Sequence, residues 1–170
     1  MQNIIYQYFV EGEDERKLIN TLKNQLGLVQ TGKVQVLNVV QNKISPVILR
    51  TLKKGTVVVL VFDTDTGNAD ILNYNIQLLN KCNYISKVIT VPQVKNLEEE
   101  LVRACNIDSI TELLNSRSKK EFKSDLIRIT NLDKKLTEHK FDINRFWSQQ
   151  PGAPYQGITN GANSIKRSVK

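Results

Sequence analysis

Cysteine, histidine and long hydrophobic runs are scarce in this sequence. Its 170 residues include two cysteines and one histidine. Cys82 and Cys105 match no metal-binding spacing, and the single His139 gives zinc catalysis little support. The cysteines predict reduced thiols and a cytoplasmic protein. No apolar run is long enough to cross a bilayer, and no signal peptide is visible, so no membrane partner is expected.

Positive charge is in excess and unevenly distributed. The chain has 24 Lys and Arg against 17 Asp and Glu, a formal net charge of +7. Acids gather at 11–15, 63–70 and 98–100, and bases at 117–123, 134–140 and 166–170. A basic excess favours an anionic partner such as nucleic acid, although solvated helix faces produce the same excess. An acidic pocket inside a basic protein suits an enzyme that holds metal ions and a polyanion together.

The first hundred residues alternate between strand-like and helix-like patterns. Strands are predicted over 4–10, 34–40, 56–62 and 87–91, with Pro92 ending the last one. The spacing of apolar residues predicts helices over 14–26, 45–52, 70–80 and 96–105. This alternation predicts an α/β fold: a mostly parallel, Rossmann-like sheet of about four strands with helices on both faces. The continuous Val/Leu run is typical of a central strand buried on both sides.

The rest of the chain differs in composition. Residues 1–106 are predicted to form the α/β core, and residues 107–148 a basic extension with helices over 109–115 and 119–130. Residues 149–170 are rich in Gly, Pro, Asn and Ser, which predicts a loop or a flexible basic tail. Phe146 and Trp147 could anchor this segment or stack on a nucleic-acid base, and packing in the core is the favoured expectation.

Two apolar strands run into acidic residues and a glycine. The first motif is Val10-Glu11-Gly12-Glu13-Asp14-Glu15, and the second is Phe62-Asp63-Thr64-Asp65-Thr66-Gly67. Because the carboxyl ends of parallel strands meet at one edge of a sheet, these carboxylates should converge. Oxygen ligands of this kind suit hard divalent cations. The pattern predicts one ion shared by Glu11, Asp63 and Asp65, with Glu15 one helical turn away. A polar loop that merely caps the next helix is the alternative.

Together, in this order, the two motifs resemble the Toprim domain. This is the catalytic fold of topoisomerases, DnaG-type primases, RecR recombination proteins and OLD (overcoming-lysogenization-defect) nucleases. Its signature is a strand ending in Glu-Gly with an acid three positions after the glycine, followed by a strand ending in Asp-x-Asp. Glu11-Gly12 with Glu15, and Asp63-Thr64-Asp65, match it. The resemblance covers about residues 3–105, makes residues 1–106 the Toprim core, and is closest to the OLD type.

The resemblance implies a nuclease that uses Mg²⁺ or Mn²⁺. A further acid in the helix after the fourth strand would serve a second ion, and Glu98 stands there. The implied metal ligands are Glu11, Glu15, Asp63, Asp65 and Glu98. An active-site lysine is also implied, with Lys119, Lys120 and Lys123 as the candidates that the sequence leaves open. The residues expected to contact nucleic acid are Arg117, Lys119, Lys120, Lys123, Lys166 and Arg167.

The function expected from these features is metal-dependent cleavage or nicking of DNA or RNA, as by an antiviral (phage-defence) effector or an RNA-processing enzyme. The alternative is a noncatalytic Toprim module that binds nucleic acid or acts as a scaffold subunit, as in RecR-like proteins. A receiver-type regulator is a third interpretation, which the Glu-Gly-x-x-Glu opening fits poorly. The chain lacks the ATPase domain of OLD proteins, so a stand-alone enzyme, a homo-oligomer or a subunit of a larger assembly is expected.

Overall fold

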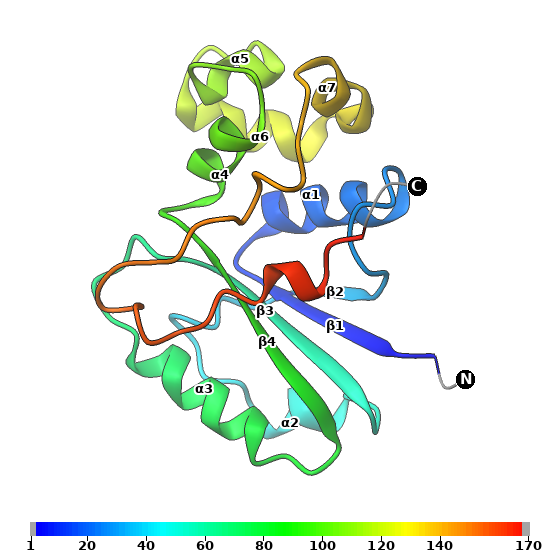
Figure 1. Ribbon diagram of the computed structural model, residues 1–170, viewed down its shortest axis with the longest axis vertical. Helices are drawn as coiled ribbons and strands as arrows, with labels where there is room; N and C mark the ends of the chain where they lie inside the picture. The colour runs from blue at the N-terminus through cyan, green and yellow to red at the C-terminus, as the bar shows by residue number, and fades with distance from the viewer. Residues whose placement is uncertain (1–2, 168–170) are drawn as a thin grey trace.

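The protein has an α/β fold built on a four-stranded parallel sheet. The computed structural model describes residues 3–167, and the strand order is β2-β1-β3-β4 with every neighbouring pair parallel (Figure 1). The strands are β1 (Ile5–Val10), β2 (Lys33–Val36), β3 (Thr56–Asp63) and β4 (Ile85–Gln93). The predicted fold class is therefore confirmed.

Helices cover both faces of this sheet (Figure 1). One face carries α1 (Glu13–Asn24), α4 (Leu97–Ala104), α5 (Ile110–Leu114), α6 (Lys119–Arg128) and α7 (Leu132–Glu138). The other face carries α2 (Pro46–Arg50) and α3 (Asp70–Asn80). A short 3₁₀ helix, η1 (Ala162–Ser164), contacts β4. The helix predicted over 70–80 has the same bounds in the structure.

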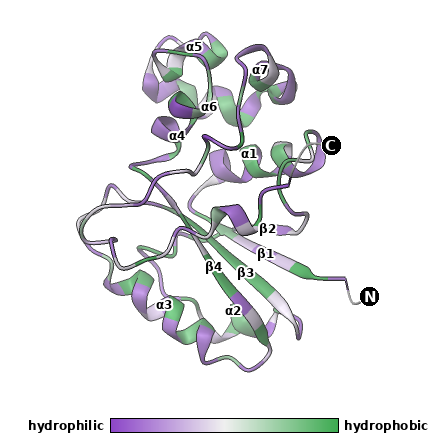
Figure 2. Ribbon diagram, in the orientation of Figure 1, coloured by the Kyte–Doolittle hydropathy of each residue, from purple (hydrophilic) through white to green (hydrophobic). Residues whose placement is uncertain are grey.

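Strand β3 lies between two hydrophobic cores. Val57, Val59 and Val61 belong to the core beneath α1, whereas Val58, Leu60 and Phe62 belong to the core beneath α3. Figure 2 shows the hydrophobic colouring of the central strands against mixed colours on the helices. Full burial of each such side chain contributes about 1.5–3 kcal/mol. The prediction of a central strand buried on both faces is confirmed.

Strands β2 and β4 differ most from the predicted ranges, whereas one bound of β1 and one of β3 differ by a single residue. Strand β2 ends at Val36 rather than at residue 40, because the Asn38 side chain accepts hydrogen bonds from the backbone N–H groups of Val40 and Gln41 and turns the chain. Strand β4 does not stop before Pro92 but continues to Gln93. It lies at the sheet edge, where a proline need not remove a ladder hydrogen bond.

The C-terminal segment (residues 149–167) is irregular apart from η1, and it packs against the core. Tyr155 and Ile165 are completely buried. The Gly161 N–H donates to the Thr90 carbonyl on β4, and the Arg167 N–H donates to the Leu28 carbonyl. Of the two predicted alternatives, a loop or a flexible tail, the described residues form a loop, and its apolar side chains pack on the core without regular spacing. Residues 168–170 of the predicted tail lie outside the described residues.

The start of this segment is anchored as expected. Phe146 and Trp147 are buried, and their ring centroids lie 4.4 Å apart, which confirms the prediction of core packing. Across residues 3–167, no helix has both the length and the apolar composition needed to cross a membrane.

Candidate metal centre

Three carboxylates meet at the carboxyl edge of the sheet. Glu11 follows β1, Asp63 is the last residue of β3, and Glu15 lies in the first turn of α1. One oxygen of each lies within 4.8 Å of the others, a separation that a single metal ion could bridge. We call Glu11, Glu15 and Asp63 the acidic triad.

Gly12 leaves room for the carboxylates of Asp14 and Glu15 beside the backbone. It caps the N-terminus of α1 and sits against the carboxylates of that helix. A Cβ atom at this position would lie 2.7 Å from Asp14 Oδ1 and 3.2 Å from Glu15 Oε2. Any side chain at residue 12 would therefore displace the two carboxylates, which explains the need for glycine here.

Hydrogen bonds fix two members of the triad and leave the third incompletely bonded. The Asp63 N–H donates to Glu11 Oε1 at 3.1 Å, and Gln93 Nε2 donates to Asp63 Oδ1 at 2.7 Å. Glu15 is only 4% exposed, and its Oε2 has no hydrogen-bond partner among the described residues. A buried carboxylate oxygen without a partner is costly. A cation bound between the three side chains would supply that partner.

All three carboxyl groups of the triad have raised pKa values, which favours their protonated forms. Burial, together with Asp14 and Asp63, raises the pKa of Glu15 to about 9. Burial, together with Glu11, raises the pKa of Asp63 to about 8. Burial also raises the pKa of Glu11. Three carboxylates so close together cannot all stay ionised at neutral pH without a compensating positive charge. The residues therefore fit a divalent cation.

Lys123 is the lysine that reaches this region. Its Nζ lies 3.5 Å from Glu98 Oε1 and 4.0 Å from Asp14 Oδ2. Burial acts to lower the pKa of Lys123, but Glu98, Asp14, Glu15 and Asp63 raise it above its ordinary value. Its side chain remains 58% exposed, so the ammonium group can still meet a ligand from solvent.

The other two candidate lysines are placed differently. Lys119 lines a separate hollow of about 410 Å³ beside Asn96, Glu98 and Ile110. Lys120 is exposed on α6. Within the described residues, neither forms an ion pair with the triad or with Glu98.

Asp65 and Glu98 do not join the triad. The Thr64 N–H donates to the Gln93 and Lys95 carbonyls, so the chain leaves the strand after Asp63 and Asp65 becomes exposed. Glu15 thus takes the place predicted for Asp65 next to Glu11 and Asp63. The negative charge of Asp65 still acts on the triad, since it raises the pKa of Glu11. Glu98 contacts Lys123 instead.

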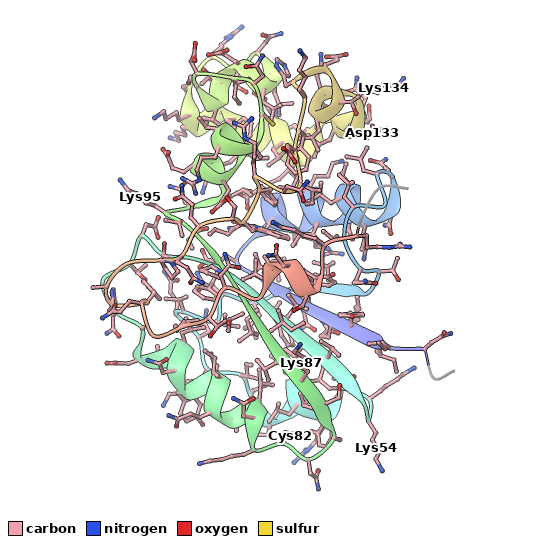
Figure 3. All side chains as sticks on the ribbon, in the orientation of Figure 1. Lys54, Cys82, Lys87, Lys95, Asp133 and Lys134 are labelled. Carbon is pink, nitrogen blue, oxygen red and sulfur yellow. The ribbon has the colours of Figure 1, made fainter. Side chains whose placement is uncertain are left out.

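The predicted nucleic-acid contacts do not form one continuous group. Arg117, Lys119 and Lys120 are exposed at or before the start of α6. Lys166 and Arg167 lie beside the chain that follows α1, where Lys166 forms a bridge with Val29. Other lysines are spread widely: Figure 3 shows Lys54 toward one end of the molecule and Lys134 toward the other. The interface with nucleic acid stays a prediction.

Sequence reasoning missed Gln93, which contacts the triad, and Glu100, which accepts a hydrogen bond from Trp147. Gln93 and Glu100 are both 0% exposed, and both hydrogen-bond to Trp147. Gln93 lies directly opposite Asp63 in the β3–β4 register. A polar residue that ends a strand next to an acidic strand end was the available signal, because such ends face the same crevice.

Comparison of the chain with protein-family models, with curated protein sequences and with solved structures gives no match. The resemblance to the Toprim domain therefore stays a prediction from the two acidic motifs. The structure itself establishes a parallel α/β fold with an acidic triad that could hold a metal ion.

Proposed function

We propose that this chain is a Mg²⁺- or Mn²⁺-dependent nuclease of the Toprim type that hydrolyses phosphodiester bonds in DNA or RNA. The observation that carries the proposal is that oxygens of Glu11, Glu15 and Asp63 lie within 4.8 Å of one another, and that one buried oxygen of Glu15 has no hydrogen-bond partner among the described residues. A partly exposed lysine, Lys123, lies beside Glu98 and Asp14 and adds the positive charge that a phosphate requires.

The acidic triad would hold the cation. Mg²⁺ keeps several water ligands and needs only one or two protein carboxylates, so three are sufficient. When bound, the ion would polarise the phosphate and activate a water molecule. Glu98, adjacent to Lys123, is in reach of a second ion or of its waters.

The side chains of the protein would perform the remaining work. Lys123 Nζ would bind a phosphate oxygen and offset the negative charge that grows there as water attacks phosphorus. Alternatively, if Glu15 and Asp63 hold the cation without it, Glu11 would donate a proton to the leaving oxygen as the phosphorus–oxygen bond breaks. Burial raises the pKa of Glu11, which favours this role, because a carboxyl with a raised pKa is protonated over a wider pH range than an ordinary one.

The proposal includes a reducing, cytoplasmic setting. Cys82 and Cys105 are both free thiols. Cys105 is buried, and burial raises the pKa of its thiol to about 12, which keeps it protonated and unreactive. Thiols of this kind are typical of proteins that need no disulfide.

The test is cleavage of labelled single- and double-stranded DNA and RNA by the purified chain with Mn²⁺ or Mg²⁺. We expect cleavage that EDTA abolishes and that Glu11→Gln lowers strongly. Asp70→Asn is the matched control, because Asp70 is an exposed acid at the start of α3 and outside the triad. Full activity in Glu11→Gln would exclude this site. Binding of Mn²⁺ and nucleic acid without cleavage would favour the noncatalytic scaffold.

A further inference from the structure

A chain of two hydrogen bonds runs from the C-terminal part of the protein into the acidic triad. Trp147 Nε1 donates to Gln93 Oε1 at 3.2 Å, and Gln93 Nε2 donates to Asp63 Oδ1 at 2.7 Å. Gln93 is 0% exposed and Trp147 is 1% exposed, so water does not compete for these bonds. Residues 54 positions apart in the sequence are thereby joined beside the candidate metal centre.

Chemistry fixes which group donates and which accepts in each of these two hydrogen bonds. An indole N–H can only donate, so it requires the oxygen of the Gln93 amide to face Trp147. The amide nitrogen then has to face Asp63, and a carboxylate oxygen accepts from it. The Gln93 side chain cannot turn over without placing two donors, or two acceptors, against each other. It therefore limits the rotation of the Asp63 carboxylate about its own bond.

Trp147 is itself held firmly. Its backbone N–H donates to Glu100 Oε2 at 2.9 Å, and the Asn160 side chain donates to its carbonyl at 2.9 Å. Glu100 Oε1 also accepts from the Val94 N–H at 2.9 Å, immediately after Gln93. Gln93 and Trp147 are thus fixed relative to each other by a separate buried carboxylate.

We propose that Gln93, oriented by Trp147, is a positioning residue that sets the Asp63 carboxylate for cation binding, so that the C-terminal part of the chain completes the metal centre. The inference rests on the proposed function, because it presumes a cation at the triad. It goes further in assigning a role to residues that touch neither the ion nor the substrate. Partners of this kind typically change metal affinity by about 10–100-fold when they are removed.

The experiment is a calorimetric Mn²⁺ titration of the full chain, with the melting temperature measured in EDTA for every variant. Gln93→Met keeps the approximate shape of the side chain and removes both hydrogen bonds. Trp147→Phe removes the indole N–H donor and leaves one ring in place of the two fused rings. Asn75→Leu is the matched control, since Asn75 is also a fully buried amide but donates to the Val39 and Asn42 carbonyls in the other core.

We expect Gln93→Met to weaken Mn²⁺ binding by about 10–100-fold and Trp147→Phe to weaken it by a smaller factor. Asn75→Leu should lower the melting temperature while its Mn²⁺ affinity stays at that of the unchanged chain. Unchanged affinity in folded Gln93→Met and Trp147→Phe would overturn the inference, as would an equal loss in Asn75→Leu. If Gln93→Met does not fold, Trp147→Phe decides. Failure of the unchanged chain to bind Mn²⁺ would overturn the metal centre itself, a distinguishable result.

Discussion

Two buried glutamates occupy equivalent places in the fold but have opposite surroundings. Glu15 lies in the first turn of α1 after β1, and Glu100 lies in the first turn of α4 after β4. They are 4% and 0% exposed, respectively. Glu100 accepts hydrogen bonds from the Val94 N–H, the Trp147 N–H and the Arg103 side chain. Glu15 Oε2 has no partner within the described residues, and one oxygen of the Glu15 carboxylate lies within 4.8 Å of oxygens of Glu11 and Asp63.

The contrast separates a structural carboxylate from one prepared for a ligand. Position on a helix does not distinguish Glu15 from Glu100, and neither does burial. What distinguishes them is whether donors surround the carboxylate. A buried carboxylate with donors on both oxygens stabilises the chain segments that supply them. One that faces other carboxylates destabilises the fold until a cation arrives, which is the arrangement expected of a functional site.

The largest effect should come from Asp63→Asn, which changes one carboxylate of the acidic triad. The amide keeps the shape of the side chain but loses the negative charge that a cation requires. We expect Mn²⁺-dependent cleavage to fall by about 1,000-fold, roughly 4 kcal/mol of transition-state stabilisation. Gel-based cleavage rates measure it. A fall of less than tenfold would mean that the triad is not the reaction centre.

The next largest effect should come from Glu100→Gln, which changes the buried carboxylate whose oxygens both accept hydrogen bonds. The new amide NH₂ would face an N–H donor, from either Val94 or Trp147, and the ion pair with Arg103 would be lost. Loss of such a buried acceptor costs about 2–3 kcal/mol in the free energy of unfolding. Thermal unfolding should show a melting temperature lower by about 4–12 °C for a chain of this size. A variant as stable as the unchanged chain would remove the basis for calling Glu100 structural.

Much of this arrangement could be predicted from the sequence, because it depends on local patterns. The Val/Leu run specified β3, and two acidic strand ends in a parallel fold specified the edge where Glu11 and Asp63 meet. The choice between Asp65 and Glu15 could not be made in the same way. It depends on the residue at which β3 ends, because a shift of one residue along a strand turns a side chain to the opposite face of the sheet.

Long-range packing set the features that the sequence did not reveal. Lys119, Lys120 and Lys123 share one helix, and only the docking of α6 against α1 decides which of them reaches the acids. The buried residues of the C-terminal segment follow no helical or strand period, so composition alone suggested mobility. Glu100 looked like one of three consecutive helix-surface acids, 98–100, because its partners come from residues 94, 103 and 147.

A third variant, Lys123→Met, tests whether the positive charge near the triad takes part in the reaction. We expect cleavage to fall by about 10–100-fold, since one charged group aimed at a phosphate contributes on this scale. Stability should change by less than about 1 kcal/mol, because the lysine side chain of these ion pairs is 58% exposed and solvent screens its charge. Lys120→Met is the matched control on the same helix, and equal losses in both variants would reduce Lys123 to a general contribution to charge.

The smallest expected effect concerns the stability of Glu15→Gln, measured against pH in EDTA. It tests the difference between Glu15 and Glu100 most directly. The pKa of Glu15 is about 9 in the folded chain, above its ordinary value of 4.5. Between these values the unfolded chain releases the proton and the folded chain keeps it, so the free energy of unfolding falls as pH rises. Glutamine does not titrate. At pH 8 the variant should therefore be more stable by about 1–2 kcal/mol, with a melting temperature higher by about 2–8 °C.

When Mn²⁺ is added, the unchanged chain should become more stable than the Glu15→Gln variant, which reverses their order in EDTA. A ligand that binds only the folded chain stabilises it by about 2.7 kcal/mol at one hundred times its dissociation constant, and the glutamine variant would lose most of this gain. Below pH 4.5, where the carboxyl is protonated in both states, the two proteins should converge in EDTA. A Glu15→Gln variant that is less stable than the unchanged chain at pH 8 in EDTA would show that Glu15, like Glu100, serves the fold, and the distinction between the two glutamates would disappear.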